Sequence, residues 1–186
     1  SGCDAQAPVT LETPTPVTLD PATVVNVSCN GGSDGSIRVN LSPAGPGVND
    51  NPPYTYVLFQ GGVPVSGPQA DPLFNGLSAG AYVVEAVSGL NCSLTQNIDI
   101  LEPAPLSITA SATAFACAPD NSVNTATITA SVPAGVGTAP YLYSIDGVNY
   151  QAGNTFEVID TGIVQPITVF VRDANSCVTS TTLTID

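Results

Sequence analysis

Five cysteines have the widest chemical range of any side chains in this 186-residue chain. A thiol can form a disulfide, bind a metal or act as a nucleophile. The sequence contains no histidine and no CxxC pair, which excludes the usual zinc sites and the Cys-His nucleophile pair. Single cysteines that lie far apart favour disulfides instead. Because disulfides persist in oxidising compartments, the pattern predicts an extracellular protein.

Acidic and amide side chains in the loops are the second group that could do chemistry. Calcium prefers clustered oxygens from carboxylates, amides and backbone carbonyls. Asp and Asn also stabilise turns with their own side chains, and this interpretation stays open beside calcium. No other cofactor is expected. The candidate calcium ligands are Asn30, Asp34, Asp50, Asp173 and Asn175.

Two pairs of tyrosines could contact a sugar. Tyr54 and Tyr56 are two residues apart in sequence, as are Tyr141 and Tyr143, so each pair would share one face of a strand. A tyrosine pair can stack on sugar rings, and it can equally pack in the core or at its rim. Tyr54 and Tyr56 are the predicted glycan contacts. No enzyme is expected, since histidine is missing and the carboxylates of a glycosidase pair are not concentrated anywhere.

The charge balance excludes several partners. Fifteen acidic residues stand against two basic ones, which gives a formal net charge of −13, and the chain has no lysine. Such a chain cannot neutralise phosphates, so nucleic-acid binding is excluded, and attraction to anionic lipid is disfavoured for the same reason. No apolar run approaches the length of a membrane-spanning helix, and no direct membrane insertion is expected.

An internal repeat of about 87 residues organises these positions. Cys29 and Cys117 lie 88 residues apart, while Pro53 and Pro140, which open matching Pro-Tyr-x-Tyr segments, lie 87 apart. The period predicts three segments. Residues 1–16 form the C-terminal end of a preceding truncated repeat, residues 17–103 form repeat one, and residues 106–186 form a divergent repeat two.

The elements that must position these side chains are strands. Alternating apolar residues at 82–87 and 167–172 are typical of strands, and Gly, Pro, Asn and Asp interrupt the chain at intervals of about 8–12 residues. No window shows a helical period. The predicted fold is all-β, with two tandem immunoglobulin-like β-sandwich modules of six to eight strands each in an extended array.

The repeat also predicts how the cysteines pair. Each full repeat holds one early and one late cysteine, which predicts Cys29–Cys92 and Cys117–Cys177 disulfides. Each closure would stabilise its module by roughly 4 kcal/mol in the chain-entropy model. Cys3 is left over as the late cysteine of the truncated repeat. Free buried cysteines, and a lipid-modified Cys3, are the alternatives.

Repeat one contains the four segments Cys29–Ile37, Pro53–Tyr56, Gly76–Val84 and Asn91-Cys92. Together these segments resemble the SprB repeat. The combination is specific, although no single segment would be. Repeat two keeps the Pro-Tyr-x-Tyr segment at 140–143 and the turn at 173–177, but it departs from the pattern around Cys117.

The resemblance implies a place for the chain on the cell surface. SprB repeats occur in very large adhesins of gliding Bacteroidetes, which are exported by type IX secretion and carried along the cell by the gliding motor. The resemblance therefore implies a stalk or adhesive filament in cell adhesion and gliding motility. Its partners would be neighbouring repeats, the motor and extracellular polysaccharide. A glycan-binding module that uses the tyrosines and the Asp/Asn loops is the alternative function.

Overall fold

The computed structural model describes residues 17–42, 52–115 and 125–186. All regular secondary-structure elements in these ranges are β-strands, which confirms the all-β prediction. No helix in the described ranges is long and apolar enough to cross a membrane. The described residues form two compact units. The first comprises the described residues up to Val25 together with Gly35–Ile100, and the second comprises Asn26–Asp34 together with Leu101–Asp186.

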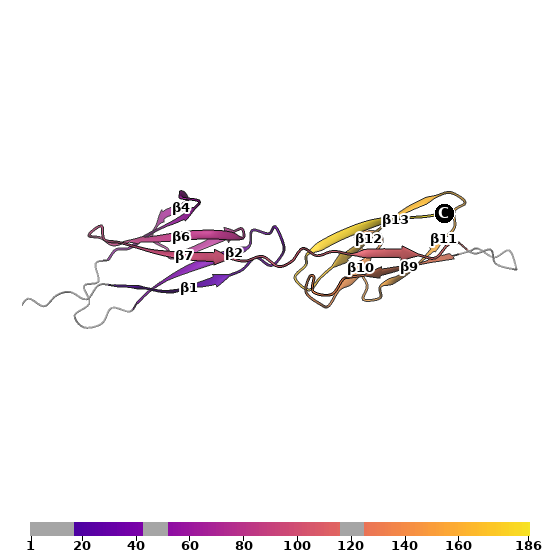
Figure 1. The fold of residues 1–186 in the computed structure, drawn as a ribbon, viewed down its shortest axis with the longest axis horizontal. Coiled ribbons are helices and arrows are strands. Elements are labelled where there is room, and N and C mark those ends of the chain that lie inside the picture. Colours follow the sequence, from indigo (N-terminus) through magenta and orange to yellow (C-terminus); the bar gives the residue numbers. More distant parts are fainter. Residues whose placement is uncertain (1–16, 43–51, 116–124) are drawn as a thin grey trace, which may run out of the picture. The chain divides into compact units, whose positions relative to one another are not determined.

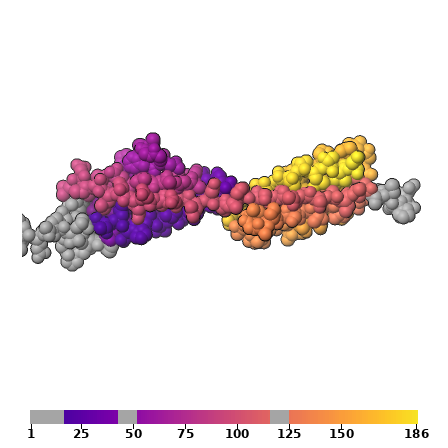
Figure 2. All heavy atoms as spheres, in the orientation of Figure 1, coloured from indigo at the N-terminus to yellow at the C-terminus, as the bar shows by residue number. Residues whose placement is uncertain are grey.

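The first unit consists of two antiparallel sheets (Figure 1). One has the strand order β1-β2-β5 and the other β4-β3-β6-β7, so the chain crosses between sheets after β2, β4 and β5. The space-filling view places the β4 region, in violet, at an edge of this unit (Figure 2). The strands are β1 Leu19–Val25, β2 Gly35–Leu41, β3 Thr55–Gln60, β4 Val63–Gln69, β5 Leu73–Leu77, β6 Gly80–Val87 and β7 Ser93–Ile100.

Alternating side chains form the core of the first unit. Tyr82, Val84 and Ala86 on β6 are all buried, while the residues between them are partly exposed. Ile37 and Val39 on β2 of the other sheet are also buried. Removing these apolar side chains from water stabilises the sandwich by about 25 cal/mol per Å² of buried area. The period-two alternation in the sequence is therefore the pattern that specifies the core.

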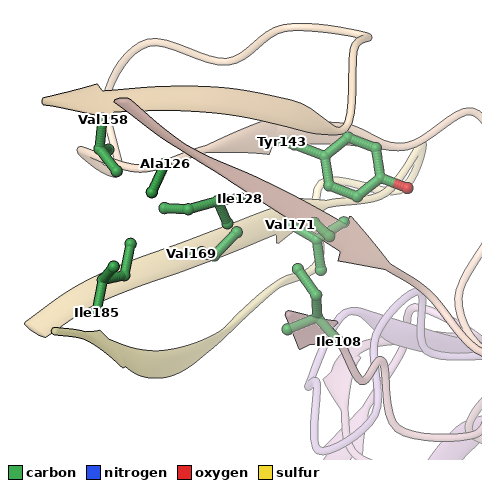
Figure 3. Packing of buried hydrophobic residues seen from close by; sticks show 9 residues of the cluster. Ile108, Ala126, Ile128, Tyr143, Val158, Val169, Val171 and Ile185 are labelled. Atoms are coloured by element: carbon green, nitrogen blue, oxygen red, sulfur yellow. The ribbon is translucent and has the colours of Figure 1, made fainter. Parts of the chain in front are cut away.

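The second unit repeats this plan with fewer described strands. Its sheets have the orders β11-β9-β8 and β10-β12-β13. The strands are β8 Thr109–Ala112, β9 Thr125–Ser131, β10 Leu142–Ser144, β11 Thr155–Ile159, β12 Gln165–Arg172 and β13 Val178–Ile185. The labelled core residues in Figure 3 are Ile108, Ala126, Ile128, Tyr143, Val158, Val169, Val171 and Ile185.

The two units differ at one sheet edge. Strand β4 pairs with β3 in the first unit, whereas β10 in the described part of the second unit has only the isolated bridge between Tyr143 and Gln151 at that position. The other strands correspond in order. With seven and six described strands in paired antiparallel sheets, the units confirm the predicted immunoglobulin-like sandwiches.

One segment departs from the predicted division of the chain. Residues 26–34 connect β1 to β2 in the first unit, yet their contacts place them in the second unit. The predicted boundaries assigned this segment to repeat one, within 17–103. The covalent and hydrogen-bonded contacts that hold it are the physical reason for the difference.

Candidate functional site

The cysteines pair differently from the sequence prediction. Cys29 forms a disulfide with Cys177, 148 residues further along the chain, with a Cα–Cα distance of 5.6 Å. Cys92 is free and exposed. The predicted Cys29–Cys92 and Cys117–Cys177 pairs are therefore wrong, because segment 26–34 brings Cys29 to the turn between β12 and β13. Cys117 and Cys3 lie outside the described residues.

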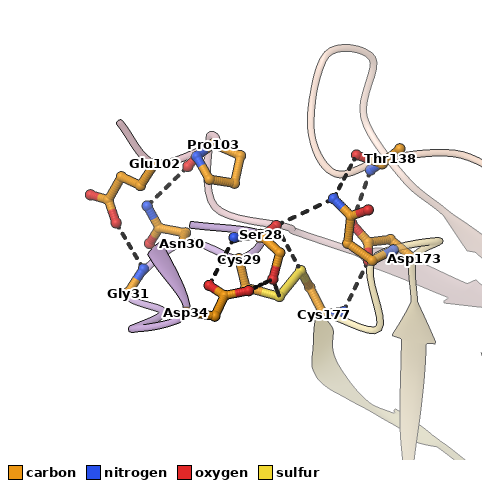
Figure 4. The surroundings of a disulfide bond; sticks show 11 residues. Ser28, Cys29, Asn30, Gly31, Asp34, Glu102, Pro103, Thr138, Asp173 and Cys177 are labelled. Atoms are coloured by element: carbon orange, nitrogen blue, oxygen red, sulfur yellow. Dashed lines mark hydrogen bonds between the residues drawn. A yellow bond between two sulfur atoms is a disulfide. The ribbon is translucent and has the colours of Figure 1, made fainter. Parts of the chain in front are cut away.

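Hydrogen bonds join segment 26–34 to the start of the connection that leads to β8. The acceptors and donors on that connection belong to residues 101–103, and both backbone and side-chain groups take part. Figure 4 shows the contacts of Glu102 and Pro103. These contacts hold the segment that carries Cys29. They are Val27 N to Leu101 O at 3.2 Å, Leu101 N to Asn26 Oδ1 at 2.9 Å, Gly31 N to Glu102 Oε2 at 2.8 Å and Asn30 Nδ2 to Pro103 O at 3.1 Å.

Asp34 closes the segment around Cys29. Its carboxylate accepts hydrogen bonds from the Ser28 hydroxyl and from Ser28 N, the second at 3.0 Å. These two bonds, the hydroxyl first, hold the pKa of Asp34 below its usual value. Gly32 N donates to Cys29 O at 2.9 Å, and Gly31 has a φ of 71°, which glycine adopts without strain.

Asp173 holds the turn that carries Cys177. It is only 6% exposed, and its Oδ1 accepts from Asn175 N and Cys177 N, both at 2.9 Å. Its Oδ2 accepts from Thr138 N at 2.9 Å. Asn175 Nδ2 donates to Ser28 O at 3.3 Å and so joins the turn to segment 26–34. Both sides of the disulfide are therefore held by carboxylates that accept backbone N–H groups (Figure 4).

The predicted calcium ligands have other partners here. Asp34 and Asp173 bond to their own turns, as the turn interpretation expected, while the amide groups of Asn30 and Asn175 donate to backbone carbonyls. Asp50 lies outside the described residues. Within the described ranges, no group of three or more His, Cys, Asp or Glu could hold a metal ion. The assignment of these residues to calcium stays a prediction.

The tyrosine pair divides between core and rim. Tyr56 on β3 is 6% exposed and packs in the core, so its predicted role as a glycan contact is wrong, because stacking needs an open ring face. Tyr54 is half-buried, and its contact with a sugar stays a prediction. In the second unit Tyr143 is buried, and the hydroxyl of Tyr141 donates to Val136 O at 2.7 Å.

Sequence reasoning missed three residues that surround the disulfide. They are Ser28, Glu102 and Thr138, whose polar groups bond to the segment or to the turn. The Pro-x-Pro segment that follows Glu102 marks the connection between repeats, but no spacing in the sequence links it to residues 26–34. These partners become evident only once the segment is placed.

The two units define a class of protein with tandem immunoglobulin-like β-sandwich modules. Residues 22–63 match the family model of the SprB repeat, which confirms the resemblance seen in the sequence. A match to this family suggests a repeat segment of a surface adhesin, and hence an extracellular location. No curated protein matches the chain.

A solved structure supports the fold. The chain is similar to the structure of three N-terminal domains of the bacteriophage RB49 Highly Immunogenic Outer Capsid protein (Hoc), with a TM-score of 0.50 and 15% identity. The alignment covers 91% of this chain and 58% of that one. At this identity the likeness bears on the fold alone.

Proposed function

We propose that the chain is a stalk segment of a large cell-surface adhesin that serves surface attachment and gliding motility. The parent protein would leave the cell by type IX secretion and move along the surface with the gliding motor. The match at residues 22–63 supports the adhesin family. The disulfide between Cys29 and Cys177 is the structural observation that carries the stalk role.

A stalk must transmit tension without losing its length. The two linked cysteines enclose residues 30–176, which contain strands β2 to β12. Tension applied to the ends of the chain passes through the sulfur–sulfur bond, so it does not extend the enclosed strands. How long hydrogen-bonded strands withstand a pulling force depends on their rate of unfolding. A covalent bond withstands forces that separate such strands. This arrangement suits a load-bearing segment and requires no catalytic cleft.

Surface labelling tests the proposal in the organism that carries the gene. An antibody raised against the 186-residue chain should stain intact cells, and the label should travel along cells that glide. A strain in which the gene is disrupted provides the control and should lose the stain. Label that appears only after the cells are lysed would contradict the surface location, and label that stays fixed on gliding cells would contradict the motor connection.

The glycan-binding alternative now depends on Tyr54. Its ring is half-buried, while Tyr56 belongs to the core. A specific hit on a glycan array that Tyr54→Ala loses and Tyr54→Phe keeps would favour this alternative, since phenylalanine preserves the ring face. Absence of any specific hit would leave the stalk role as the better account.

A further inference from the structure

We propose that the second unit binds a carboxylated sugar, the uronic acid residue of a polysaccharide, through Arg172 and Tyr150. The guanidinium carbon of Arg172 lies 4.4 Å from the centroid of the Tyr150 ring. Both residues lie in the second unit, whereas Tyr54 lies in the first. The proposal therefore adds a binding site to the stalk role, and it depends neither on Tyr54 nor on the disulfide.

Arg172 carries donors that the described part of the chain does not use. Among the described residues, no carboxylate forms an ion pair with Arg172 and no oxygen accepts a hydrogen bond from it, although the chain contains 15 acidic residues. The side chain is half-buried, so its charge has lost part of its hydration. Stacking occupies the face of a guanidinium, while its N–H groups point outward in the plane. A planar carboxylate can therefore bind the edge while the ring contact is kept.

Strand β12 places Arg172 on the outer face of its sheet. Val171 beside it is fully buried in the core, so the side chain of Arg172 points the other way. The register partners of Arg172 are Leu142 on β10 and Val178 on β13. Because cross-strand partners share one face, these two apolar side chains flank the arginine. Val178 is 52% exposed and offers an apolar contact to the C–H groups of a sugar ring.

Tyr150 is held in place by the residues on both sides of it. The Asp146 carboxylate accepts hydrogen bonds from the two backbone N–H groups that immediately precede Tyr150, both at 2.8 Å. On the other side, Gln151 and Tyr143 exchange two backbone hydrogen bonds, at 2.8 and 2.9 Å. The ring is thus positioned before a ligand binds, which lowers the entropy cost of binding.

The first unit shows that this arrangement belongs to the second unit. Gln69 pairs with Tyr56 there as Gln151 pairs with Tyr143 in the second unit. Each glutamine Nε2 also donates to the carbonyls two and four residues further along the chain. The connection from tyrosine to glutamine spans residues 57–68 in the first unit, where it includes most of β4, and only residues 144–150 in the second. The shorter connection ends on the aromatic residue of the site.

The arginine is likewise absent from the first unit. Val87 and Arg172 each precede the residue whose N–H closes the following turn, Ser88 N to Cys92 O at 2.9 Å and Asp173 N to Cys177 O at 3.0 Å. Valine in place of arginine removes the donors. Two independent differences between the repeats, in a connection and at the end of a strand, therefore meet at one place on the second unit.

A single guanidinium favours a ligand whose carboxylates are spaced apart. Arg172 is the only basic residue of the second unit, and the chain carries a net charge of −13, which repels densely charged polymers. A uronic acid presents one carboxylate together with hydroxyls and C–H groups. The Tyr150 hydroxyl, which bonds to no described residue, can pair with a sugar hydroxyl. An acidic peptide shares only the carboxylate, and it serves as a competing ligand in the test.

Titration of the full 186-residue chain with trigalacturonic acid tests the proposal. Calorimetry measures the affinity, and amide shifts of isotope-labelled protein locate the site. We expect binding that weakens as salt is raised, with shifts centred on residues 142, 150, 172 and 178. The uncharged methyl ester of the same trisaccharide should bind about tenfold more weakly, because hydrogen bonds to charged groups are the stronger ones.

Variants with a matched control decide between a site and general attraction. Arg172→Gln should weaken binding about tenfold, and Arg172→Lys should also weaken it, since an ammonium lacks the planar fork. Arg38→Gln removes the same charge from an exposed arginine of the first unit and should leave the affinity unchanged. Thermal unfolding verifies that each variant is folded.

Four outcomes would overturn the proposal. They are no binding at millimolar trisaccharide, equal binding of the ester, equal losses in Arg172→Gln and Arg38→Gln, and tighter binding of the peptide Ser-Glu-Ser than of the trisaccharide. Since these measurements concern the ligand alone, such a failure would leave the surface-labelling test of the stalk role unaffected.

Discussion

Asp173 accounts for much of the local order around Cys177. Three backbone N–H groups donate to its two carboxylate oxygens, and the side chain is almost entirely buried. Removal of such an acceptor leaves three partly buried backbone N–H groups without their partner, which costs more free energy than the hydrogen bonds themselves contribute on balance. The residue looked like a calcium ligand in the sequence, because the same oxygen-rich chemistry serves turns and cations alike.

We predict that Asp173→Ala lowers the free energy of unfolding of the second unit by about 2–3 kcal/mol. Urea denaturation, followed by amide exchange in β12 and β13, measures the loss. Asp160→Ala is the matched control, because Asp160 is exposed and its carboxylate accepts a hydrogen bond from Gly162 N in an open loop. Equal effects of the two substitutions would refute the role of Asp173.

At the scale of single elements, the turn after β10 is built around another carboxylate. The Asp146 carboxylate accepts hydrogen bonds from the Asn149 side chain, from Val148 N and Asn149 N, and from the Ser144 hydroxyl. The bond from the Asn149 side chain is the largest cause that lowers the pKa of Asp146, and the others add to it. A lowered pKa in the folded state means that the ionised form is bound more strongly there than in the unfolded chain.

This turn should therefore depend on pH. The stabilisation by ionised Asp146 is present above the unfolded pKa of about 3.9 and is lost as the pH falls through the lower folded pKa. We predict that Asp146→Asn destabilises the second unit at pH 6 and that the difference from the unsubstituted chain shrinks towards pH 2. Thermal unfolding across this range measures the difference. A gap that stays constant with pH would rule out the carboxylate charge as its cause.

The strands and cores could be predicted from the sequence, and the pairing of the cysteines could not. Alternation at Tyr82, Val84 and Ala86 specifies a strand with one buried face in any sandwich. In a chain of repeats, however, an early cysteine has two equivalent late cysteines as possible partners, one in its own repeat and one in the next repeat. Cys92 and Cys177 stand at the same position within their repeats, so the spacing of the cysteines alone does not show which of them is the partner of Cys29. Only the path of residues 26–34 decides between them.

At the scale of the whole molecule, the disulfide limits how far the chain can be extended. The enclosed 148-residue separation corresponds to about 500 Å of fully extended backbone. We predict that single chains stretched from their ends reach about 500 Å further after reduction than before it. Force spectroscopy measures this length. Cys177→Ser should gain the same length without reduction, and Cys92→Ser should gain none; a gain in both variants would contradict the Cys29–Cys177 assignment.

The path of the disulfide also determines what a protease can do to the chain. Any single cut of the backbone between Cys29 and Cys177 leaves two pieces that the sulfur–sulfur bond still joins. The two ends of the chain therefore stay connected after cuts anywhere between Cys29 and Cys177, and they separate only when such a cut is combined with reduction of the disulfide.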